Sequence, residues 1–402
     1  MSETFFADPR QVAGLGRLTA EIGQQTLTSY RYFNDHGQLT GVDNGELFGS
    51  LAVTFDALRD VWRDRHVHLA TNCAGLGDEL NTAAWLYADQ EKKNYEALNA
   101  HTDLVPVPYP DPGDADRPAR GNVEPYSDCA HYGSPEGMDY PAPAHFPDDV
   151  ADVIADAAGW LGDLDYAIEE LIGHSPLREL IDPIGGNWND LRRLGAAYRI
   201  AGEAMSAGGD SLAEGTSRVD EFWDGLAAVA YKDYAARQIA AMRWEGSCGR
   251  VIEAVADRAA DEIRKSVFTL VTTMRERLEA QVDVSSPAKV AEFLSKKVSP
   301  LGSLYQIYKI ADILYSGYTL AKKLLDDIRM VTDAFNEFLS LVASPSGYLN
   351  EQFQQKLEPI TKGIHNARLV KDVYDTASAE PVYNVPKGSF SVGTGRQPWE
   401  DA

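Results

Sequence analysis

The apolar residues of this chain recur at steps of three, four or seven positions over most of its length. The clearest series runs through one segment: Phe55, Leu58, Trp62, Leu69, Cys73, Leu76, Leu80, Ala84 and Tyr87. This spacing places every member on one face of an α-helix, whereas the two-residue alternation of a strand occurs nowhere in the chain. An apolar helix face must be covered by another element. We therefore predict an all-α protein built from packed amphipathic helices.

The same periodicity predicts the other helices. Asp8-Pro9 opens the first one, because Asp caps free amides and Pro is tolerated at the first helical position. A turn is expected over residues 35–49, before the helix that carries the series above. Further helices are expected over residues 148–172, 188–222, 226–282, 304–342 and 350–374. Gly246 and Gly249 are the positions where the helix over 226–282 could kink or break.

A proline-rich stretch divides the chain. Residues 101–150 hold 10 of the 20 prolines, each of which removes a backbone donor and restrains its predecessor to extended conformations. The predicted organisation is residues 1–100, a linker over 101–147 whose tyrosines could dock on a neighbouring surface, residues 148–300, a helical region over 301–375, and an unstructured tail over 376–402.

Charge and hydropathy exclude several classes of protein. The 61 acidic residues outnumber the 37 basic ones, which gives a net charge of -24 and argues against nucleic-acid binding. The most apolar region, residues 301–324, is interrupted by charged side chains, so we predict no stable membrane span. The first residues lack a basic start followed by an apolar run, so export would need a route other than a general signal peptide.

No spacing of catalytic groups is found. His66 and His68 lie about 200° apart around a helix, so we expect two solvated side chains rather than metal ligands. Cys248 is expected to be a structural thiol. We predict a non-enzymatic protein with no catalytic residue, no metal site and no cofactor.

One turn motif carries a family resemblance. Trp223-Asp224-Gly225, followed by Leu-Ala-Ala-Val-Ala-Tyr, lies between two long predicted helices. This string resembles the turn of the WXG superfamily, the helical-hairpin proteins exported by type VII secretion systems of actinobacteria and firmicutes. The resemblance covers residues 155–282 and implies that the glycine permits a sharp turn beside an exposed tryptophan.

The first 95 residues resemble EspC-like type VII secretion targets. The match lies in FFADP near the start, in ELFG at residues 46–49 and in LGDELNTAAWLYADQEKKN. Phe48 and Gly49 stand where the Trp-x-Gly turn would be. Tyr87 and Glu91 match the family's export signal, Tyr-x-x-x-Asp/Glu, whose spacing puts both side chains on one helix face.

The resemblance implies a function and a partner. In the family, the Trp-x-Gly turn of one hairpin lies beside the Tyr-x-x-x-Asp/Glu tail of another, and the secretion ATPase reads the pair. We therefore expect a type VII secretion substrate or secretion-associated protein that folds in the cytoplasm and is released or displayed outside. Its partners would be that ATPase and its machinery, with a WXG-type partner or self-association. Residues 9–98 and 187–282 would form one four-helix bundle that brings Tyr87 and Glu91 near Trp223 and Gly225.

Two other functions fit the sequence. The acidity suits an intracellular helical binding module, either a scaffold or a partner that neutralises a basic toxin. A membrane-active helical effector would use residues 301–324. Export separates the first alternative from the secretion hypothesis, because an intracellular module has no need of a secretion signal.

Overall fold

The computed structural model describes residues 6–40, 46–99, 123–144, 179, 187–281, 300–343, 367–378 and 380–386. Its helices are α1 (Pro9–His36), α2 (Glu46–Asn99), α6 (Trp188–Val219), α7 (Leu226–Gln281), α9 (Pro300–Ala343), α11 (Ala367–Ala377) and α12 (Glu380–Tyr383). These ranges hold no strand, so the predicted all-α class is confirmed. The helix expected over 148–172 and most of the one expected over 350–374 lie outside the described residues.

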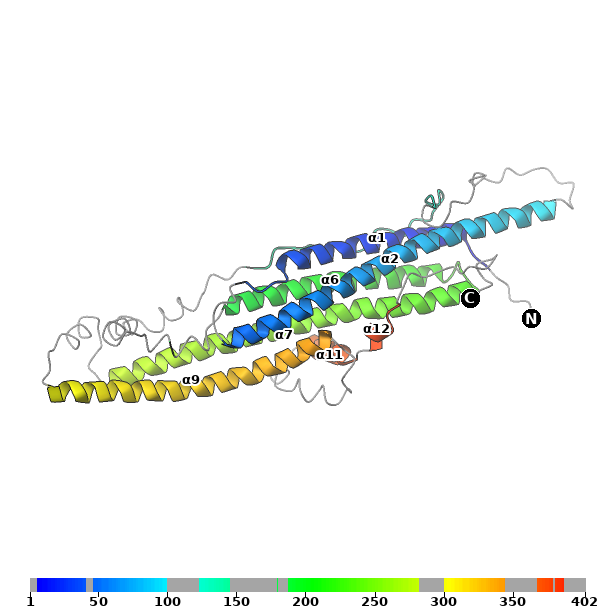
Figure 1. Ribbon diagram of the computed structural model, residues 1–402. Helices are drawn as coiled ribbons and strands as arrows, with labels where there is room; N and C mark the ends of the chain where they lie inside the picture. The colour runs from blue at the N-terminus through cyan, green and yellow to red at the C-terminus, as the bar shows by residue number, and fades with distance from the viewer. Residues whose placement is uncertain are drawn as a thin grey trace.

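The long helices form an elongated bundle (Figure 1). α1 packs on α2 and on α6, α6 packs on α7, and α9 packs on both α7 and α2. α1 and α7 run in the direction opposite to α2, α6 and α9, as the colours in Figure 1 show, so α2 and α9 pack in parallel. Segments 9–98 and 187–282, which we expected to lie together, contact each other mainly through α1 and α6.

Asp8 caps α1 by accepting a hydrogen bond from the Arg10 amide at 2.9 Å.

The connection between α1 and α2 is shorter than predicted. The predicted turn extended to residue 49, but α2 begins at Glu46, so Phe48 and Gly49 lie in its first turn. The apolar face of α2 explains the difference, because it reaches back to Leu51, which is fully buried.

Glycines set the distance between α6 and α7. A methyl group at Gly246 would lie 2.7 Å from Cβ of Ser206, and one at Gly249 would overlap the carbonyl oxygen of Tyr198. Both glycines are interior residues of a continuous α7, so the break considered from the sequence is not found. The close approach that they permit outweighs their cost in helix propensity of about 1 kcal/mol each.

The predicted apolar series of α2 is buried throughout, with each of its nine members at most 3% exposed. Large aromatic rings dominate one half of the core. The Tyr198 ring centre lies 4.7 Å from that of Phe33 and 5.0 Å from that of Trp62. Such edge-on contacts add to the burial of apolar area, and they join α1, α2 and α6.

A buried polar cluster ties α2, α7 and α9 together. Glu245, whose side chain is 1% exposed, accepts hydrogen bonds from Arg65 Nε at 2.6 Å and Nη2 at 3.1 Å. Arg65 also donates to the carbonyl oxygen of Val342 near the end of α9. Burial is the largest single influence and would raise the pKa of Glu245, but the charges and hydrogen bonds of Arg65 and His66 together outweigh it and lower that pKa below its ordinary value.

His66 belongs to the same cluster, so the prediction of a solvated side chain is wrong. It is fully buried, and its Nδ1 lies 3.1 Å from Oγ of Ser29. The Ser29 hydroxyl in turn reaches the carbonyl oxygen of Ala201 at 3.2 Å. The reason is tertiary: α1 and α6 cover a face of α2 whose partners cannot be read from local spacing.

The described part of the proline-rich stretch lies on the bundle. Residues 123–144 have no helix or strand, as the prolines predict. Tyr32 donates to the carbonyl oxygen of Pro141 at 2.9 Å, and Trp85 donates to that of Glu124 at 2.9 Å. Tyr132 lies under the guanidinium of Arg218, 4.2 Å from ring centre to Cζ. These contacts attach the segment to α1, α2 and α6.

The prediction of an unstructured tail is wrong for residues 376–378 and 380–386. α11 ends at Ala377, and α12 follows it. Asp372 of α11 is buried and accepts hydrogen bonds from Arg250 at 2.6 and 2.7 Å. Asn72 donates to the carbonyl oxygen of Pro386 at 2.9 Å. These are contacts with α7 and α2, which the composition of the tail does not reveal.

None of the described helices has an apolar stretch that could cross a membrane.

We expect Gly249→Ala to lower the free energy of unfolding by about 1–3 kcal/mol, because the new methyl group forces α6 and α7 apart. An unconstrained helical position would instead gain from this change. Urea unfolding followed by circular dichroism measures the difference. Gly137→Ala is the control, since a methyl group there meets nothing within 4 Å. Equal midpoints for both variants would contradict the close approach.

We expect Arg65→Met to lower the free energy of unfolding by about 3–5 kcal/mol, because it leaves the buried Glu245 carboxylate without its partner. Arg63→Met is the matched control: Arg63 is 41% exposed, and its pairs with Asp60 and Asp64 lie on the surface. Such pairs contribute at most about 1 kcal/mol. Comparable losses in the two variants would show that the buried pair has no special role.

Candidate functional site

The connection between α6 and α7 is a tight turn that depends on one glycine. α6 ends at Val219, and the Phe222 amide donates to its carbonyl oxygen at 2.8 Å. Gly225 has φ of 102°, a conformation that other residues rarely adopt. Its carbonyl oxygen accepts the Val229 amide at 3.1 Å, which is the first hydrogen bond of α7. The glycine of the Trp-x-Gly string thus makes the turn.

The residues before α1 are bonded to this turn. The Asp8 amide donates to the carbonyl oxygen of Phe222 at 2.9 Å, and the Asp224 amide donates to that of Phe6 at 2.8 Å. Ala7 and Trp223 face each other in the resulting antiparallel bridge. Sequence reasoning noted FFADP only as a resemblance and missed this pairing. A single bridge has too little alternation to be recognised from sequence.

Trp223 is buried, so the exposed tryptophan that the resemblance implied is not found. It is 1% exposed, and its Nε1 donates to Oη of Tyr87 at 3.2 Å. The rings of Tyr87 and Trp223 are 6.2 Å apart at 65°, and Tyr231 covers Trp223 at 5.3 Å. The N-terminal segment and α2 close over the turn, which explains the burial. Tyr87 and Trp223, 136 positions apart, are therefore in direct contact.

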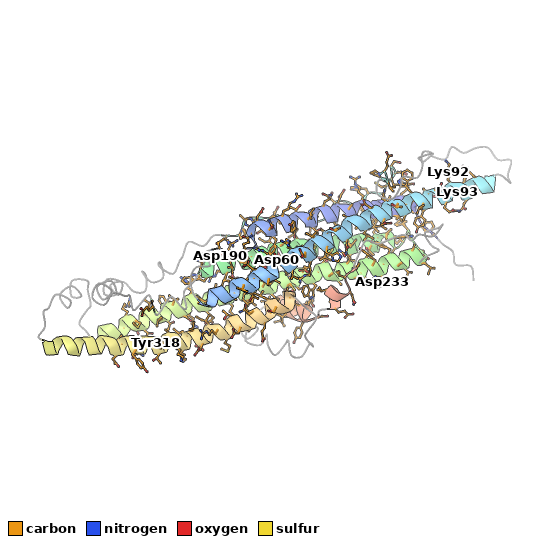
Figure 2. The ribbon with its side chains drawn as sticks, viewed as in Figure 1. Asp60, Lys92, Lys93, Asp190, Asp233 and Tyr318 are labelled. Carbon is orange, nitrogen blue, oxygen red and sulfur yellow. The ribbon has the colours of Figure 1, made fainter. Side chains whose placement is uncertain are left out.

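Glu91 lies one helical turn beyond Tyr87 and is exposed. Figure 2 labels its neighbours Lys92 and Lys93 toward the C-terminal end of α2. Lys93 pairs with Asp89 at 2.7 Å on the same stretch of helix. The carboxylate of the predicted signal is thus accessible to solvent, whereas its phenol is covered.

Phe48 and Gly49 are not brought to this site. They lie in the first turn of α2. Gly49 is 38 residues before Tyr87, and a helix rises 1.5 Å per residue, so the separation is roughly 57 Å. The end of α1 and the start of α2 therefore lie far along the bundle from the turn between α6 and α7, and α7 and α9 extend beyond them (Figure 1).

The described residues hold no group of three or more His, Cys, Asp or Glu side chains that could bind a metal ion. A hollow of about 440 Å³ between α6, α7 and α11 is lined by Arg243, Lys371 and other polar side chains. Its cations already have acidic partners: Arg243 bonds Asp210 at 2.7 Å, and Lys371 bonds Asp375 at 2.9 Å. The hollow therefore offers no free charge to a ligand from these two residues.

Comparisons with known proteins give no relative: no protein-family model, curated protein or solved structure matches the chain.

The burial of Tyr87 makes the stability of the fold depend on pH in the alkaline range. Burial raises the pKa of Tyr87 from 10.0 to about 12, although the hydrogen bond from Trp223 acts in the opposite direction. The folded state favours the neutral phenol, so this contribution to stability is complete below pH 10 and is lost as the pH rises toward 12.

We expect Tyr87→Phe to be less stable than the wild type by about 1 kcal/mol at pH 7, because the Trp223 donor loses its acceptor. The difference should shrink between pH 10 and pH 12, since the variant has no phenol to ionise. Urea unfolding at pH 7, 10, 11 and 12 measures it. Tyr315→Phe, at a side chain 71% exposed, is the control. Parallel pH profiles for Tyr87→Phe and the wild type would contradict this prediction.

Proposed function

We propose that this chain is a non-enzymatic substrate or associated protein of a type VII secretion system. Its export signal is composed of the Tyr87 and Glu91 segment of α2 and the turn around Trp223 and Gly225. The machinery at the membrane reads the signal on the folded protein, which then leaves the cell. The family assignment itself rests on the sequence resemblance.

The observation that carries the proposal is the contact between Tyr87 and Trp223. The resemblance divides the signal into a Trp-x-Gly turn and a Tyr-x-x-x-Asp/Glu segment that must lie side by side. Here their aromatic members share a hydrogen bond of 3.2 Å and lie in one apolar cluster. Chance matches to a four-residue spacing are common in a chain with 19 tyrosines. A chance match, however, is not expected to place its tyrosine against the tryptophan of a Trp-x-Gly turn.

Burial assigns different roles to the members of the signal. Tyr87 is 3% exposed and Trp223 is 1% exposed, so a partner cannot touch either ring without unfolding this end of the bundle. Their contact fixes α2 against the turn. Glu91 is exposed and charged, and it is therefore the group of the segment that a partner reads directly.

The test compares two neutralised carboxylates on the same exposed stretch of α2, Glu91→Gln and Glu96→Gln. The extracellular fraction of the full chain is measured by immunoblotting culture filtrate and lysate of the native host, after each variant is shown to melt like the wild type. We expect Glu91→Gln to reduce export about tenfold, which corresponds to about 1.4 kcal/mol of binding free energy. Glu96→Gln should be exported normally.

Equal export of both variants would remove Glu91 from the signal. A wild-type chain that stays in the lysate would overturn the secretion proposal. The intracellular binding module would then become the leading function, and the acidic surface would direct the search to a basic partner.

A further inference from the structure

Three large apolar side chains are exposed around the buried Trp223. Phe6 is 56% exposed, Leu226 is 52% exposed and Val229 is 60% exposed. Exposed apolar side chains that are scattered singly are ordinary, but a group of them marks an interaction site. We call Phe6, Leu226 and Val229 the turn surface.

The backbone explains why these side chains are directed away from the core. Ala7 and Trp223 face each other across the antiparallel bridge, with Trp223 turned into the core. Successive side chains of an extended segment point to opposite sides, so Phe6 and Asp224 are directed away from that core. Leu226 and Val229 are three positions apart in the first turn of α7 and share one helix face. The Asp224 amide bond to the Phe6 carbonyl joins the two parts.

Acidic side chains accompany the turn surface. Glu221 and Asp224 are both exposed in the turn. Asp224 accepts the Gly225 amide at 2.7 Å, which fixes its carboxylate beside the apolar group. Asp220, the first residue of the turn, instead pairs with Lys232 of α7. The surface thus presents an apolar centre with negative charge beside it.

We propose that the turn surface is the docking site for one protein of the export machinery, a folded domain with an apolar hollow rimmed by Lys or Arg. This proposal rests on the proposed function and adds to it the side chains that are read. Trp223 is a positioning residue: its burial against Tyr87 holds the turn in place, and Phe6, Leu226 and Val229 enter the hollow. Glu221 and Asp224 meet the basic rim.

The first experiment measures export of the full chain from the native host. The triple variant Phe6→Ser, Leu226→Ser, Val229→Ser is compared with Val53→Ser and Tyr318→Ser, whose side chains are 72% and 61% exposed. Figure 2 shows Tyr318 at the opposite end of the molecule from Lys92 and Lys93. We expect the triple variant to fall roughly tenfold or more in its extracellular fraction, as for a few central contact residues, and the controls to be unchanged. Matched melting curves show that all variants fold.

The second experiment places a photo-crosslinking amino acid at position 229 or, as the control, at position 53. We expect position 229 alone to form an adduct with one membrane-associated protein, identified by mass spectrometry. Glu221→Lys with Asp224→Lys should reduce the adduct several-fold, whereas Asp60→Lys with Asp64→Lys, two exposed acids elsewhere on α2, should not.

The outcomes separate the two proposals. If the wild type and the triple variant are exported equally, the docking site is overturned and the secretion proposal stands. If the wild type is not exported, the secretion proposal fails. The crosslink then tests the docking site by itself: an adduct from position 229 alone that the lysine substitutions reduce supports a docking site for a basic partner. Adducts from both positions, or none, overturn it.

Discussion

The ion pair between Arg65 and Glu245 is the constraint on which the arrangement of the long helices depends. A carboxylate that is almost completely buried is tolerated only if a cation and hydrogen-bond donors meet it at close range. This requirement fixes α2 opposite α7, and the bond from Arg65 to Val342 then fixes the end of α9. Apolar burial supplies most of the stabilisation, but it is non-directional and would allow the helices to slide. The pair selects one register.

Two kinds of helix contact follow from this arrangement. The backbones of α6 and α7 approach closely where glycines lie between them. The backbones of α2 and α7 remain further apart, because polar side chains lie between them. Two of these side chains, Asn72 and Gln238, share a hydrogen bond of 3.3 Å. With these two spacings, α2 extends past the turn between α6 and α7, and Tyr87 contacts Trp223. The candidate site is therefore a consequence of packing that begins far from it.

Much of the fold could be predicted from sequence, because helix periodicity and capping are local signals. The start of α1 at Asp8-Pro9 and the burial of all nine members of the α2 series follow from spacing alone. What could not be predicted depends on tertiary partners. The burial of His66 beside Ser29 and the bond from Asn72 to Pro386 depend on partners distant in sequence. Around the site, spacing and resemblance predicted that Tyr87 lies near Trp223. Neither indicated the burial of Trp223 or the outward direction of Phe6.

The bonds between the start of the chain and the turn join residues more than 200 positions apart, such as Asp8 and Phe222. During synthesis, the segment that begins α1 is made before the turn, and its bonds to the turn cannot form until the ribosome has passed residue 224. A nascent or truncated chain therefore lacks this surface, even when α1 and α2 have already formed. The surface can form only after residues 222–229 have been synthesised, so any protein that binds it selects chains that have reached the start of α7 over shorter ones.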